Sequence, residues 1–164
     1  MENQHEPNSL KEQMRNVIEE ARMVLPGIQA LFGFQTIAVF NQRFMDLPRP
    51  MQVCHLLALA LVVLAIALAM APAAYHRIVE SHQVSEQTVR LSSGFICAAL
   101  APLAGGLALD MAVVLYLVTP SYAASAAGTA GTLALLLGLW FALPLRARKQ
   151  RGEAPAHRSR LPGH

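Results

Sequence analysis

The sequence predicts an all-α membrane protein with four transmembrane helices plus an N-terminal amphipathic helix. Of its 164 residues 54% are hydrophobic and only 14% are charged, whereas about a quarter of the residues of globular proteins are charged. The charges are also segregated, because they gather in the first 22 residues, two short connectors and the C-terminal tail. The apolar stretches between them, of about 20 residues or more, match the hydrocarbon thickness of a bilayer.

Residues 1–22 form the first predicted segment, a cytoplasmic amphipathic helix. Ser9 and Glu12 have the spacing of a capping box, which marks a helix start. The apolar residues that follow share one stripe, as an amphipathic helix requires; they are Leu10, Met14, Val17, Ile18 and Ala21. Two interpretations stay open: a helix that binds the membrane surface or a partner, and a solvated segment that packs loosely on the bundle.

A transmembrane bundle is predicted over residues 23–145. Its four spans are expected at about 23–44, 53–75, 91–118 and 122–145. Pro26 suits a first helical turn or a kink. At 1.5 Å per residue the third span covers roughly 40 Å, so it must tilt, protrude or kink near Pro102. Residues 146–164 form a basic cytoplasmic tail whose composition predicts disorder.

The distribution of Lys and Arg predicts that both termini are cytoplasmic. With four spans, the N-terminus, the 76–90 connector and the tail share one side, which carries eleven basic residues against two on the other. The positive-inside rule assigns the richer side to the cytoplasm. The eleven are Lys11, Arg15, Arg22, Arg77, Arg90, Arg146, Arg148, Lys149, Arg151, Arg158 and Arg160, and the two are Arg43 and Arg49. No basic groove with interleaved aromatic residues occurs, so nucleic acid is not an expected partner.

Small residues recur at four-residue spacing on three of the predicted spans. Such stripes let helix backbones approach closely inside a membrane. Either they pack one bundle internally or one of them forms a homo-oligomer face, since four helices offer more small faces than one bundle needs. The expected partners are therefore the lipid bilayer and possible further copies of the chain. The stripes are Ala65, Ala69 and Ala73; Ala104, Ala108 and Ala112; and Ala126, Ala130, Ala134, Gly138 and Ala142.

Three polar residues on three different spans are expected at one depth, in the outer third of the membrane. Asp110 is the only acidic residue within a span, and an intramembrane carboxylate is a functional hypothesis by default. Arg43 is its preferred partner, because a long side chain with a fork of donors suits a carboxylate; His55 is the second choice. Three interpretations stay open: a structural clasp, a protonation site in a proton or ion pathway, and an Asp110 that faces water.

Other candidate residues lie on the first span and just after the second. Gln29, Gln35 and Thr36 either bond to neighbouring helices or line a wet cavity. His76 and Arg77 are expected to anchor the chain among lipid headgroups.

We expect neither an enzyme nor a cofactor. The sequence shows no serine–histidine–acid set, no phosphate-cradling loop and no redox pair, so it offers no catalytic residue. Cys54 and Cys97 form no CxxC motif and hold no metal by themselves. They should also stay unpaired, because the predicted spans separate them by roughly 20 Å in depth.

Two stretches of the sequence resemble a known family. They contain Leu25-Pro26-Gly27 within residues 21–44, and Ala71-Pro72-Ala73-Ala74-Tyr75-His76-Arg77 within residues 55–78. This resembles an uncharacterised bacterial family of small multi-pass membrane proteins, a domain of unknown function, some of whose relatives carry an automatic sodium–proton antiporter label. The resemblance covers the first two spans, about half the chain, and it implies a multi-pass protein of the bacterial cell (inner) membrane. Four spans leave little room for the inverted repeats of most secondary transporters unless the protein oligomerises.

The expected function is therefore that of an integral membrane protein with a structural, accessory or stress-adaptive role. The alternative is a small oligomeric proton- or cation-coupled transporter or channel component that uses Asp110.

Overall fold

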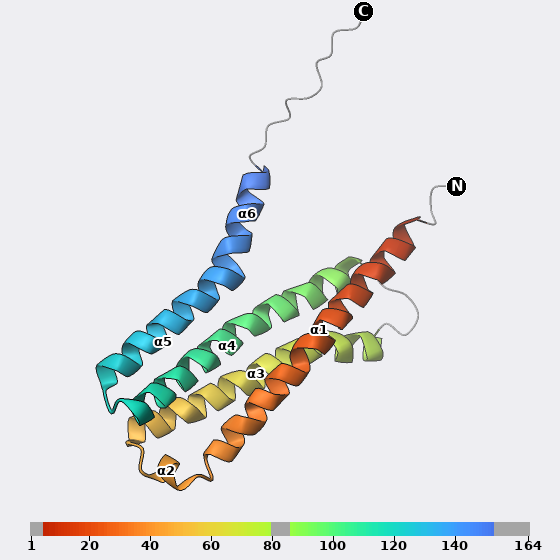
Figure 1. Cartoon of the computed structure of the whole chain (residues 1–164). Helices are drawn as coiled ribbons and strands as arrows, with labels where there is room; N and C mark the ends of the chain where they lie inside the picture. Colours follow the sequence, from red (N-terminus) through yellow and green to blue (C-terminus); the bar gives the residue numbers. More distant parts are fainter. Residues whose placement is uncertain (1–4, 80–85, 153–164) are drawn as a thin grey trace, which may run out of the picture.

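The computed structural model describes residues 5–79 and 86–152, and every regular element in these ranges is helical (Figure 1). The elements are α1 (His5–Ala38), α2 (Gln42–Met45), α3 (Arg49–Val79), α4 (Glu86–Val118), α5 (Tyr122–Leu137), the π-helical turn η1 (Gly138–Ala142) and α6 (Leu143–Gly152). In Figure 1, α1 begins and α6 ends at the same end of the bundle, and α2 lies at the opposite end. All the long helices therefore run between two common ends.

Three helical segments are long and apolar enough to cross a membrane. They are Arg49–Tyr75, Thr88–Val118 and Tyr122–Gln150, and they match the second, third and fourth predicted spans. The described part of the chain is thus all-helical, with three helices suited to a bilayer. Helix α1 is not one of the three, because its first half carries the charged residues of the amphipathic segment.

The N-terminal part of the chain differs from the prediction of a separate helix over 1–22 and a span over 23–44. The structure has one continuous helix, α1, with Pro26 inside it. Proline removes one backbone donor, and the helix continues because its remaining hydrogen bonds persist on both sides of that position. The chain leaves the helix after Ala38, earlier than predicted, and turns into the short α2.

The contact between α3 and α4 is the most extensive in the bundle. Small residues permit it: a Cβ atom added to Gly106 would lie 3.0 Å from Val62 Cγ2 and 3.1 Å from the Ala58 carbonyl oxygen. The predicted stripe on α4, Ala104, Ala108 and Ala112, is buried as well, but its four-residue spacing puts it on the side of α4 that carries Leu115 and faces α5, roughly opposite Gly106.

Helix α5 packs chiefly on α4 through a different face from its predicted small-residue stripe. Ser125 is its only buried residue, and a Cβ atom on Gly128 would collide with Leu115 of α4. The stripe starts one position after Ser125, about 100° further round the helix, and so points away from α4. Its exposed members are Ala126, Ala130, Ala134 and Ala142.

The C-terminal segment stays helical beyond the predicted end of the bundle. Helix α6 continues to Gly152, because its Leu, Ala, Arg, Lys and Gln residues are good helix formers. The rest of the predicted tail, residues 153–164, lies outside the described residues. The two cysteines are free, with Cys54 half-buried and Cys97 exposed, which confirms the prediction that they do not pair.

Candidate functional site

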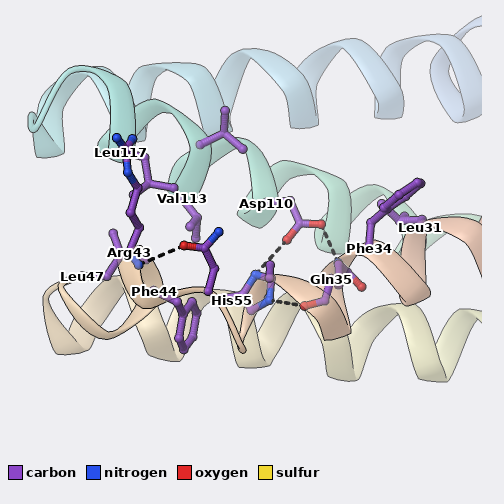
Figure 2. A pocket seen from close by; sticks show the side chains of 13 residues that line it. Leu31, Phe34, Gln35, Arg43, Phe44, Leu47, His55, Asp110, Val113 and Leu117 are labelled. Atoms are coloured by element: carbon purple, nitrogen blue, oxygen red, sulfur yellow. Dashed lines mark hydrogen bonds and ion pairs between the residues drawn. The ribbon is translucent and has the colours of Figure 1, made fainter.

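A buried polar cluster joins α1, α3 and α4 near the end of the bundle that carries α2 (Figure 2). Gln35 lies in the last turn of α1. His55 lies about two turns inside α3, and Asp110 lies about two turns before the end of α4. These three residues, named here the Gln–His–Asp cluster, meet because the ends of all three helices converge there.

The hydrogen bonds of the Gln–His–Asp cluster form a closed ring. The side-chain amide Nε2 of Gln35 donates to Oδ2 of Asp110, and the other carboxylate oxygen, Oδ1, lies 3.4 Å from His55 Nδ1. The other imidazole nitrogen, Nε2, lies 2.9 Å from the backbone carbonyl oxygen of Gln35. Gln35 therefore holds the His55–Asp110 pair from both ends.

The geometry of this ring can hold one proton between His55 Nδ1 and Asp110 Oδ1. A carbonyl oxygen only accepts, so the hydrogen bond to Gln35 requires a proton on His55 Nε2. The Nδ1 atom and the carboxylate oxygen facing it are both acceptors unless one of them is protonated. With that proton present, the pair is either imidazolium–carboxylate or imidazole–carboxylic acid, and its net charge is zero in both forms.

Most of the cluster is buried, which strengthens its electrostatic interactions. The Asp110 carboxyl is the part that stays partly exposed. His55 and Gln35 are each 4% exposed, whereas the Asp110 side chain is 19% exposed. The ring of Phe44 covers His55 edge-on, with ring centroids 5.3 Å apart. One polar atom is left over: Gln35 Oε1 is buried without a hydrogen-bond partner.

The preferred pairing of Asp110 with Arg43 is wrong, because the structure places His55 and Gln35 at the carboxylate. Arg43 lies on α2, is exposed, and points away from Asp110 in Figure 2. Its backbone N–H bonds to the side chain of Asn41, which caps α2. This short helix directs the guanidinium outward, where it keeps its hydration, and the shorter His55 already lies at the required depth.

The other predicted site residues do not join the cluster. Gln29 and Thr36 are exposed, and the Thr36 hydroxyl donates to the carbonyl of Phe32, one turn earlier in the same helix. Arg77 is exposed near the end of α3. His76 lies in the same helix, but its side chain is outside the described residues.

An apolar cavity of about 390 Å³ opens beside Asp110, within the size range of small-molecule pockets. Phe34 of α1 and Val114 of α4 are among its apolar walls, and the Gln–His–Asp cluster supplies polar groups. Asn41 and Arg43 line it as well. A second cavity of about 360 Å³ shares Arg43, Leu47 and Leu117 with the first and adds Asp46.

Gln35 was only one of several candidate polar residues in the sequence, Asn41 belongs to the same polar run, and Phe44 was not among the predicted site residues. The available signal for Gln35 was its position near the C-terminal end of the predicted first span, at a predicted depth close to that of His55. Within residues 5–79 and 86–152, no three of His, Cys, Asp and Glu lie close enough together to hold a metal ion.

Comparison with known proteins gives one match. No curated protein and no solved structure matches the chain. One family model matches residues 3–144, which include the Gln–His–Asp cluster, and its description reads "Family of unknown function (DUF6328)".

Proposed function

Since the chain belongs to this family of unknown function, we propose a role from its own structure: a non-enzymatic integral membrane protein with an accessory or stress-adaptive role. The observation that carries this proposal is the closed ring of the Gln–His–Asp cluster. A ring in which each bonded group has its partner holds three helices in one arrangement, which is the property of a structural clasp. A buried pair that is already satisfied more often fixes geometry than moves ions.

We propose four spans, with α1 as the fourth helix in the membrane. Its second half packs on α3 and α4 through Ile28, which joins Val62 and Leu103 in the core. On its outer side Met23 and Ile37 are 77% and 68% exposed. Large apolar side chains exposed on this scale suit lipid, whereas in water they would form an unfavourable surface.

The same arrangement supports an inner-membrane protein with both termini in the cytoplasm. The end of the bundle that carries α2 holds Arg43 and Arg49, and the end where α1 begins and α6 finishes holds most of the other basic residues (Figure 1). Under the positive-inside rule the second end faces the cytoplasm. The exposed small-residue stripe of α5 is then free to meet another copy of the chain within the membrane.

A second candidate is a small oligomeric proton- or cation-coupled transporter or channel component. One observation favours it: the Asp110 carboxyl is partly exposed next to a cavity instead of being fully enclosed. A carboxyl that exchanges its proton with a cavity could couple proton movement to another solute. In this case the Gln–His–Asp cluster would be the coupling site.

One experiment separates the two functions. The purified protein is reconstituted in liposomes, a pH or cation gradient is imposed, and flux is followed by dye quenching. The accessory role predicts that wild type, Asp110→Asn and empty vesicles give equal flux. Transport predicts flux from wild type that Asp110→Asn abolishes, while the matched variant Asp46→Asn, an exposed acid on α2's C-terminal side, retains it.

A further inference from the structure

The polar end of the cavity beside Asp110 has more hydrogen-bond acceptors than donors. Gln35 Oε1 is a buried acceptor without a partner, and Gln35 is among the residues that line the cavity. The Asp110 carboxyl, also in the cavity wall, is partly open to it. An unmet buried acceptor costs free energy until a donor reaches it, so this end of the cavity favours a ligand that carries N–H or O–H donors.

The remaining walls favour a ligand with an apolar body. Leu31, Phe34, Val113, Val114 and Leu117 surround most of the space. Phe34 and Phe44 add aromatic rings, whose faces attract cations. A compact apolar group with one donor-rich cationic head therefore complements both the walls and the polar end.

We propose that this cavity binds a protonated lipophilic amine, with its ammonium group at Asp110 and with the buried Gln35 Oε1 as a second acceptor once the Gln35 amide turns toward the cavity. The ammonium brings three donors and one positive charge, and it takes over the neutralising role of the proton shared by His55 and Asp110. Binding therefore releases that proton to solution: the ammonium enters, the shared proton leaves, and the net charge of the occupied site is unchanged. This inference rests on the proton-holding cluster of the proposed function, and it applies whether or not the amine crosses the membrane.

The charged and titratable groups around the site determine whether each substitution strengthens or weakens amine binding. His55 is the titratable neighbour from α3, and Arg43 on α2 also lines the cavity. Gln35 is the polar group from α1, and α5 carries no titratable residue except Tyr122, whose ring packs against Tyr116. Arg43 opposes a bound cation, so removing its charge should tighten amine binding.

Three probes with the same adamantane body separate charge from hydrogen-bond donation. Aminoadamantane carries both, trimethyladamantylammonium carries the charge without donors, and adamantanol carries a donor without the charge. Binding is measured by calorimetry to the full chain in phosphatidylcholine nanodiscs, with empty nanodiscs subtracted, and proton release is followed with an indicator dye in weak buffer.

The expected order of affinity is aminoadamantane, then trimethyladamantylammonium, then adamantanol, with about tenfold or more between the first and the last. About one proton should be released per amine bound, and the apparent affinity should rise about tenfold per pH unit while the site keeps its proton. Asp110→Asn should abolish the preference for the amine, Arg43→Gln should strengthen amine binding, and Asp46→Asn should leave it unchanged.

The ligand series on the wild-type protein keeps the test valid even if Asp110→Asn unfolds. Equal affinity for the amine and the alcohol without proton release would show a merely apolar cavity and overturn the inference, as would the absence of binding by all three probes. Equal affinity for the two cations would overturn the part assigned to Gln35 Oε1. None of these results bears on the clasp, which is tested separately by the unfolding measurements below.

Discussion

The imidazole of His55 on α3 places its Nδ1 atom 3.4 Å from Oδ1 of Asp110 on α4. Because the other imidazole nitrogen bonds to the backbone of α1, this contact ties all three helices together. The contact is strongest when a proton lies between the two side chains.

We predict that His55 and Asp110 are energetically coupled and that Arg43 and Asp110 are not. In a double-mutant cycle of His55→Gln and Asp110→Asn, the coupling free energy should be about 0.5–3 kcal/mol, as for residues in one hydrogen-bond network. The matched cycle of Arg43→Gln and Asp110→Asn should be additive within about 0.5 kcal/mol. Unfolding in mixed micelles, followed by circular dichroism, gives both values. Coupling only in the Arg43 cycle would contradict the structure.

Gln35 should be far more sensitive to substitution than Gln29. Gln35→Leu removes the donor to Asp110 Oδ2 and leaves a partly buried carboxyl oxygen unmet, so it should lower the free energy of unfolding by about 1–3 kcal/mol. Gln29 is exposed, and Gln29→Leu should change that free energy by less than about 0.5 kcal/mol. The same denaturation assay compares them. Equal effects of the two substitutions would mean that the Gln–His–Asp cluster does not stabilise the fold.

The close approach of α3 and α4 predicts a strong effect at Gly106. In Gly106→Leu the new side chain meets Val62 and the rigid backbone at Ala58, and overpacking of this kind costs about 1–3 kcal/mol. Gly131→Leu is the matched control, because a Cβ atom there has nothing within 4 Å. Thermal unfolding of the two variants should therefore differ by several degrees, with Gly106→Leu the less stable. A tolerated Gly106→Leu would indicate a looser α3–α4 contact.

Reporter fusions test the four-span topology and the role of α1. A reporter active only in the cytoplasm should work when fused after Glu86 or after Arg151, and it should fail after Leu47, because that position follows a complete crossing by α1. If α1 lies on the membrane surface and only three helices cross, Leu47 shares a side with the N-terminus and lies opposite the 76–90 connector and the tail. A membrane-impermeant thiol reagent separates the two cases in a chain without Cys54 and Cys97. With four spans it should label a cysteine introduced at the exposed Asp46 but not one at the exposed Arg15, whereas with three spans it should label both or neither.

The sequence by itself determined the class of protein and most of its helices. Long uncharged stretches are stable only in the apolar interior of a bilayer. Composition alone therefore predicted the three spans that correspond to α3, to α4 and to the continuous helical segment from α5 to α6. Their boundaries at Val118 and Tyr122 followed from the uncharged turn around Pro120, which cannot continue a helix. Asp110 was also identifiable from sequence, since a lone acid within an apolar stretch is costly.

Only the tertiary structure decided which side chain meets Asp110 and which face each small-residue stripe presents. Periodicity places residues around a helix axis, but it contains no information on how neighbouring helices are rotated relative to one another. Depth estimates made Arg43 and His55 equally accessible to Asp110, and the early end of α1 at Ala38 then turned Arg43 outward. The packing of α1 against α3 and α4 brought Gln35, whose partner no local pattern identifies, into contact with both members of the pair. Packing between helices set these contacts, because it fixes the rotation of each helix that the sequence pattern leaves free.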